Sequence, residues 1–150
     1  MRPVSELIPV LQVAIGPVIL ISGVGLLLLT MTNRLGRVID RARTLVRELK
    51  DLTPEETSRV VEQIGILSRR AGLLQRAIIL ASLSVLLAAV LVIVLFVTAV
   101  SRSEDPWLIS ALFVSVMAFL IASLVAFIQD INQSLIAVRL DLGEVWPPKP

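Results

Sequence analysis

The chain has 150 residues, of which 56% are hydrophobic and 17% charged, and its mean hydropathy is +0.90. A water-soluble domain of this length could not bury so many apolar side chains, so the composition predicts an integral membrane protein. The chain has no Cys, His or Tyr, which excludes disulfides, thiol nucleophiles and thiolate or imidazole metal ligands. Its net charge is only +2, but the basic residues are concentrated in one segment, a pattern that more often sets membrane topology than binds nucleic acid.

Three apolar runs cover residues of about 8–32, 77–100 and 107–128, and none of them contains a charged residue. Each is long enough to cross a bilayer, because a membrane-spanning helix needs about 20 residues. The first run is too long for a cleaved signal peptide, and its basic residues follow the run instead of preceding it. The sequence therefore predicts an all-α integral membrane protein with three transmembrane helices in a single membrane domain, 1–150.

The basic residues predict how the protein is oriented. Segment 33–76 carries ten Lys and Arg residues, whereas the loop between the second and third runs, SRSEDP, carries only Arg102. The positive-inside rule then places segment 33–76 and the C-terminal tail in the cytoplasm, with the N-terminus and the SRSEDP loop outside. We expect the protein in the inner (plasma) membrane of a bacterial cell.

Segment 33–76 is patterned as a helical hairpin. Apolar residues recur at alternating spacings of three and four along two stretches: Leu35, Val38, Ala42, Leu45 and Leu49, then Val60, Ile64, Leu67, Ala71, Leu74 and Ile78. Between the stretches, Thr53, Pro54 and Glu56 have the types and spacing of a helix N-terminus with a capping box. The pattern predicts an antiparallel hairpin whose apolar seams bury each other, with a coiled coil between copies of the chain as a further role.

Small residues within the apolar runs are candidates for bending and close packing. Gly16 and Pro17 predict a kink in the first run and a candidate hinge. Tight helix contacts in lipid favour small residues, and the chain offers Gly23 and a stripe in the third run: Ala111, Ser115, Ala118, Ala122 and Ala126. Because a lone three-helix bundle has little interior, we expect a homo-oligomer.

Polar residues gather where all three runs reach the cytoplasmic boundary. This predicted boundary layer consists of Asn33, Arg34, Arg37, Asp40, Arg41, Arg76, Gln129, Asp130 and Gln133. A carboxylate at this depth is costly unless it is solvated or paired, so we expect Asp130 to pair with Arg34, Arg37 or Arg76. The arginines of the first helix either contact lipid phosphates, lock a buried polar network or line a vestibule. Residues 129–150 are expected to form a cytoplasmic helix and tail against the base of the hairpin.

Two stretches carry a family resemblance. The pattern PVILIS-x(3)-LLLLT-x-TNRLGRVIDRAR and the later FIQDINQSLIAVRLDL resemble an uncharacterised family of small bacterial and cyanobacterial membrane proteins, catalogued only as a domain of unknown function. The resemblance covers nearly the whole chain and implies an integral membrane protein with three spans. It implies no activity and no catalytic residues.

The residues favour a protein that is not an enzyme. The chain has no nucleotide-binding glycine motif and no cluster of metal-ligand residues, and the acids near the membrane are explained more simply by pairing with arginine. We expect no cofactor, no metal and no nucleic-acid partner. The leading hypothesis is a homo-oligomer that forms a channel or pore. The alternative is a noncatalytic scaffold or regulator whose hairpin binds a protein partner or anionic lipid.

Overall fold

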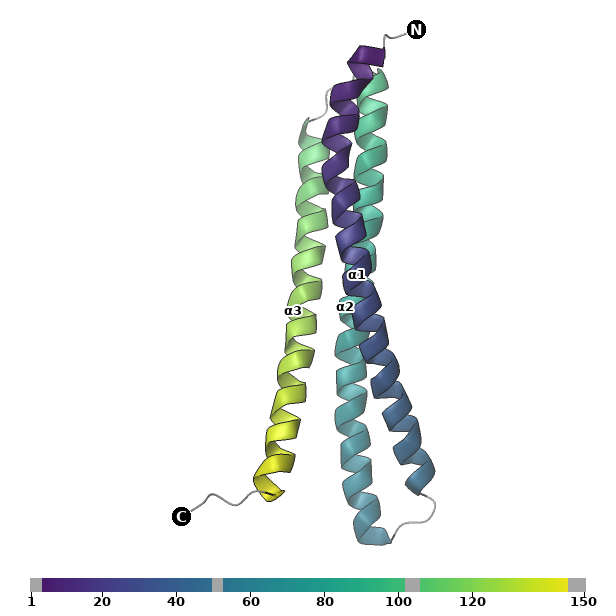
Figure 1. Cartoon of the computed structure of the whole chain (residues 1–150), viewed down its shortest axis with the longest axis vertical. Helices are drawn as coiled ribbons and strands as arrows, with labels where there is room; N and C mark the ends of the chain where they lie inside the picture. The colour runs from purple at the N-terminus through teal and green to yellow at the C-terminus, as the bar shows by residue number, and fades with distance from the viewer. Residues whose placement is uncertain (1–3, 50–52, 102–105, 146–150) are drawn as a thin grey trace. The chain divides into compact units, whose positions relative to one another are not determined.

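The computed structural model of the chain describes residues 4–49, 53–101 and 106–145 (Figure 1). These residues form three long α-helices: α1 spans Val4–Glu48, α2 spans Pro54–Ser101 and α3 spans Pro106–Val145. No strand occurs within the described ranges. All three helices are long and apolar enough to cross a membrane. The predicted all-helical fold with three candidate spans is confirmed.

The helices run on beyond the apolar segments of the sequence without a break. α1 continues through Pro17 and on to Glu48, and α3 continues past Ile128 to Val145. Pro17 removes a backbone hydrogen bond, yet it does not end the helix. The predicted C-terminal helix is thus the continuation of the third span, while the tail at 146–150 lies outside the described residues.

The chain divides into two compact units. Unit 1 contains Met1–Thr30 and Ile78–Ser123, and unit 2 contains Met31–Ala77 and Leu124–Pro150. These divisions fall within a few residues of the ends predicted for the apolar runs. Unit 1 therefore holds most of the apolar sequence, and unit 2 holds the basic segment and the polar end of α3.

Large apolar side chains face outward all over unit 1. Leu26 is 70% exposed, Ile19 65%, Val114 64% and Ile93 62%. An exposed apolar surface of this kind is unfavourable in water and normal against lipid tails. Together with the helix lengths, this surface fits a membrane protein.

The buried residues of α2 follow one repeat over the middle of the helix, from Leu74 to Leu91. Its buried positions are spaced alternately by three and four: Leu74, Ala77, Ala81, Ser84, Ala88 and Leu91. Small residues here let helices approach closely, which is how helices associate in lipid. In unit 1, the buried Ser84 hydroxyl also donates a hydrogen bond of 2.9 Å to the carbonyl oxygen of Val116 on α3.

The other two helices bury every seventh residue. The series on α1 is Val24, Met31, Val38 and Leu45, and the series on α3 is Val116, Ser123 and Asp130. A seven-residue repeat keeps one face of a helix turned toward its neighbours. On α3, one position of this buried repeat is occupied by an aspartate, Asp130.

In unit 2, the C-terminal part of α1 (residues 31–48, the α1 arm) and the N-terminal part of α2 (residues 54–77, the α2 arm) lie side by side. The residues of the predicted seams in unit 2 are all buried or half-buried in these arms. At the start of α2, the carboxylate of Glu56 accepts hydrogen bonds from the backbone N–H of Thr53 at 3.0 Å and from its hydroxyl at 2.7 Å. These bonds belong to a capping box that fixes the first turn of the helix.

The small residues singled out in the sequence are mostly exposed in the single chain. A Cβ atom added at Gly23 would have no neighbouring atom within 4 Å, so Gly23 does not serve a close approach between helices of one chain. Ala111, Ala118 and Ala122 are exposed, while Ser115 and Ala126 are half-buried. The face of α3 that is buried within the chain is the neighbouring one, which carries Val116, Ser123 and Asp130, so packing through the stripe stays a prediction about contacts between copies.

Candidate functional site

Asp130 is a buried charged residue in unit 2. It lies on α3 and its exposed fraction is 0%. It follows Ser123 by seven residues, and so it lies on the buried face of the helix. A carboxylate without water must be balanced by opposite charge and by hydrogen-bond donors, or it destabilises the fold by several kcal/mol.

Two arginines from different helices supply that balance. Arg70 on the α2 arm donates a hydrogen bond from Nε to Oδ1 of Asp130 at 3.3 Å. Arg34 on the α1 arm places Nη2 at 3.1 Å from Oδ2. The guanidinium groups are themselves largely covered, with side chains 19% and 24% exposed. One carboxylate therefore links all three helices within unit 2.

Ser134, one turn after Asp130, completes the network. Its hydroxyl oxygen accepts hydrogen bonds from Nη2 of Arg70 and, at 3.5 Å, from Nη2 of Arg34. The same hydroxyl donates to the backbone carbonyl of Asp130 at 3.0 Å. Arg34 also stacks over the ring of Phe127 at 5.3 Å from its centroid, a cation–π contact that further fixes this guanidinium.

The two oxygens of Asp130 are held differently. Oδ1 accepts the hydrogen bond from Arg70, whereas Oδ2 has no hydrogen-bond donor among the described residues. The guanidinium of Arg34 lies close to Oδ2 without the alignment of a hydrogen bond, so its attraction there is that of an ion pair. The carboxylate is thus neutralised in charge but not saturated in hydrogen bonds.

The structure brings together only part of the predicted boundary layer. Of the three expected partners of Asp130, Arg34 pairs with it, while Arg37 and Arg76 are exposed and do not. Asp40 is also exposed and has a weak ion pair with Arg43 at 3.9 Å. The remaining members of the layer are exposed as well: Asn33, Arg41, Gln129 and Gln133.

Arg70 and Ser134 belong to the network but not to the predicted layer. Arg70 precedes Leu74 by four residues, so it extends the buried series Leu74–Ala77–Ala81 by one step toward the N-terminus of α2. An arginine that continues a buried stripe needs a buried acid nearby, but the burial of this stripe is seen only in the structure, so the sequence did not single out Arg70. Ser134 lies one turn beyond Asp130 on the same face, and the same helical spacing could have identified it.

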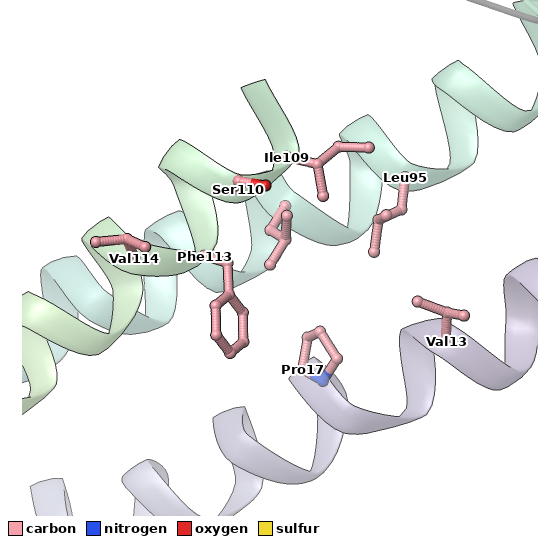
Figure 2. A pocket seen from close by; sticks show the side chains of 8 residues that line it. Val13, Pro17, Leu95, Ile109, Ser110, Phe113 and Val114 are labelled. Atoms are coloured by element: carbon pink, nitrogen blue, oxygen red, sulfur yellow. The ribbon is translucent and has the colours of Figure 1, made fainter. Parts of the chain in front are cut away.

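Apart from the Asp130 network, the structure has an apolar pocket in unit 1. It has a volume of about 450 Å³ and is lined mostly by apolar side chains, with Val13 and Pro17 from α1, Leu95 from α2 and Phe113 from α3 among them. Figure 2 shows the rings of Pro17 and Phe113 reaching into the space between the helices. Its one polar lining residue is Ser110, so this pocket offers little chemistry beyond contact with apolar groups.

The network around Asp130 is suited to binding and positioning. Its acid is closed off from solvent and already engaged by two cations, and arginine keeps its proton at any physiological pH. Among the described residues, no group of three or more Asp and Glu side chains could hold a metal ion.

The fold and the outward-facing apolar surface define a polytopic helical membrane protein. The family described as "Protein of unknown function (DUF2721)" matches residues 14–140, and the chain belongs to this family. The resemblance seen in the sequence is thereby confirmed, and the match includes α1 from Ala14 onward, all of α2 and the Asp130 network. No curated protein and no solved structure matches the chain.

Proposed function

We propose that the protein is a noncatalytic membrane scaffold or regulator that acts through its two arms. The observation that carries the proposal is the junction at Asp130, where one carboxylate binds an arginine from each arm. Such a junction holds the arms in one arrangement relative to the end of α3, and a fixed arrangement is what a binding platform needs. In this proposal the arms and the C-terminus lie in the cytoplasm and the N-terminus lies outside.

The surface of the arms supports a binding role. Val46, Val61 and Ile66 are each about half exposed, and they lie among exposed basic residues such as Arg47 and Arg59. The exposed acids Glu48 and Glu62 lie beside them as well, but arginine outnumbers the acids among the exposed charged residues of the arms. Apolar groups with an excess of positive charge nearby fit a partner with an apolar patch and an acidic rim, or the headgroup region of anionic lipids. Both partners remain in the proposal, since both use the same surface.

Site-specific photo-crosslinking in native membranes tests this proposal. A photoreactive residue at Val46 or Val61 is expected to give an adduct of discrete mass, while the same residue at Ala122, which is exposed on α3 in unit 1, gives none of that mass. An adduct at the mass of two chains would instead indicate contact between copies. If the arm positions give no protein or lipid adduct, the proposed role of the arms is wrong.

A homo-oligomer that forms a channel is the second candidate, and the exposed residues of α1 favour it. Thr30, Asn33 and Arg37 all face outward, and a ring of chains could turn them toward a common axis. The hydroxyl of Thr30 already donates to the carbonyl of Leu26 at 3.0 Å, which reduces what it could offer to an ion. Mass measurement in detergent and conductance in bilayers test this candidate: a monomer with no conductance would rule it out.

A further inference from the structure

A basic pocket lies between the two arms of unit 2. It has a volume of about 260 Å³, and six of the described residues line it: Arg34, Arg37, Val38 and Arg41 of the α1 arm, and Leu67 and Arg70 of the α2 arm. Four of the six are arginines and none is acidic. The two apolar residues belong to the seam between the arms, so the pocket has a packed floor below the guanidinium groups.

The positive charge of this pocket is only partly balanced. The buried carboxylate of Asp130 pairs with Arg34 and Arg70. Arg37 and Arg41 are exposed, and neither has an acidic partner within 4.0 Å in the part of the chain that the structure describes. The nearest acid in sequence, Asp40, pairs with Arg43 instead. Among the side chains that the structure describes, four guanidinium groups thus share one carboxylate, an excess of three positive charges.

The arginines differ in how firmly they are held. Arg34 and Arg70 are fixed by Asp130 and Ser134, so an anion bound to them loses little side-chain entropy. Arg37 and Arg41 are one helical turn apart at the exposed side, where they are free to close on a ligand. This combination of two positioned cations and two adaptable ones is typical of a site that receives an anion.

We propose that this pocket binds a phosphate monoester. One guanidinium group can bind two phosphate oxygens at once through two parallel N–H donors. The single carboxylate of Asp130 cannot bind all four arginines in this way. A phosphate monoester carries a charge of about −1.5 to −2 at pH 7, which suits the excess charge better than the single charge of a diester. The ligand is either the phosphomonoester headgroup of a lipid or inorganic phosphate, because both present a phosphate group with nearly two negative charges and at least three terminal oxygens.

This inference rests on the proposed function, because it names the ligand of the same arms. It also gives Asp130 a second role. The carboxylate holds Arg34 and Arg70 toward α3 and leaves their remaining donors for the pocket, so Asp130 is a positioning residue for the anion.

Lipid retention by the full-length protein tests the inference. The protein is placed in nanodiscs of phosphatidylcholine that contain a minor share of phosphatidic acid, a monoester, or of phosphatidylglycerol, a diester, and retained lipid is counted by native mass spectrometry. The variant Arg37→Gln/Arg41→Gln removes the two adaptable arginines without touching Asp130. Its control, Arg69→Gln/Arg76→Gln, removes two exposed arginines of the α2 arm that do not line the pocket.

We expect the wild type to retain phosphatidic acid in preference to phosphatidylglycerol, and the pocket variant to lose about tenfold or more of that retention, while the control keeps it. Inorganic phosphate added to phosphatidylcholine nanodiscs separates the sources: competition with the lipid and a rise in melting temperature would indicate a free phosphate ligand. Equal losses in both variants, or no preference for the monoester, would overturn the inference. If retention fails while Val46 and Val61 still give specific adducts, only the inference fails and the proposed function stands.

Discussion

Arg70 and Asp130 are sixty residues apart in the chain and are joined by a hydrogen bond of 3.3 Å from Nε to Oδ1. Arg34 approaches the other oxygen of the same carboxylate. The end of α3 is therefore tied to both arms by one buried acid.

Asp130→Asn should destabilise the protein markedly. The variant keeps the shape of the side chain but leaves two largely buried guanidinium groups without their counter-charge, which we expect to cost about 2–4 kcal/mol. Thermal unfolding in detergent measures the loss. Asp40→Asn is the control, because the Asp40 and Arg43 side chains are 77% and 72% exposed and such pairs contribute at most about 1 kcal/mol. Equal losses of stability in the two variants would show that the buried ion pairs of Asp130 stabilise the protein no more than an exposed pair does.

Arg70→Gln should be far more harmful than Arg76→Gln. Both residues are arginines of α2, but Arg70 contacts Asp130 and Ser134 whereas Arg76 is exposed. We expect the melting temperature to fall for Arg70→Gln and the stability to stay within about 0.5 kcal/mol of the wild type for Arg76→Gln. A greater loss at Arg76 would favour the pairing expected from the sequence over the one in the structure.

The contrast between Arg70 and Arg76 shows how far the sequence could predict this site. Hydropathy and charge locate the apolar helices, the basic segment and the depth at which Asp130 lies, because these depend on composition averaged over many residues. They do not fix which side of a helix faces its neighbours. The expectation that Arg34, Arg37 or Arg76 pairs with Asp130 rests on depth in the membrane, whereas the pairing that forms also depends on how each helix is rotated about its axis.

The stripes of small residues likewise show that the sequence does not fix which face of a helix is packed. The stripe on α3 from Ala111 to Ala126 has a regular spacing, yet its middle lies on the surface. The stripe that packs is on α2, at Ala77, Ala81, Ser84 and Ala88. Both stripes have helical periodicity, and the sequence alone does not say which one meets another helix of the same chain.

A larger side chain at a buried position of α2 should therefore destabilise the fold, whereas a larger side chain at an exposed position of the α3 stripe should not. Ser84→Leu forces a larger side chain into a buried position and removes the hydrogen bond to Val116, which we expect to cost about 1–3 kcal/mol. Ala122→Leu lies on the exposed side and should leave thermal stability unchanged. If copies of the chain pack through the stripe, Ala122→Leu would lower the mass of the detergent complex. A loss of monomer stability at Ala122 would contradict the packing.

Glu56 should titrate at lower pH than an ordinary glutamate. The hydrogen bonds from the hydroxyl and the N–H of Thr53 stabilise the carboxylate and lower the pKa of Glu56 from 4.5. A lowered pKa in the folded state stabilises the helix start at pH values above the ordinary value, and that contribution is lost as the pH falls through the folded value. A carboxyl NMR titration measures the pKa directly.

Thr53→Ala should move the pKa of Glu56 back toward 4.5, because it removes the hydroxyl donor. Thr57→Ala is the control, since the Thr57 hydroxyl donates to the carbonyl of Thr53 and not to Glu56. If Thr53→Ala leaves the pKa unchanged, the capping box does not form in solution.

Single cysteines can test the proposed orientation, because the chain has no cysteine of its own. Cysteine at Val61, which is exposed on the α2 arm, should be protected from a membrane-impermeant maleimide in intact cells and labelled after lysis. Cysteine at Ser101, the exposed last residue of α2, should be labelled in intact cells. The reverse pattern would invert the topology and place the arms outside the cell.

The most direct test of the account is a double-mutant cycle between Arg70 and Asp130. The free energy of unfolding is measured for the wild type, Arg70→Gln, Asp130→Asn and the double variant. If the two side chains stabilise the protein through each other, Arg70→Gln should cost much less once Asp130 is already Asn, with a coupling energy of at least about 1 kcal/mol. Additive losses, within about 0.5 kcal/mol, would contradict the claim that Asp130 holds the arms through Arg70.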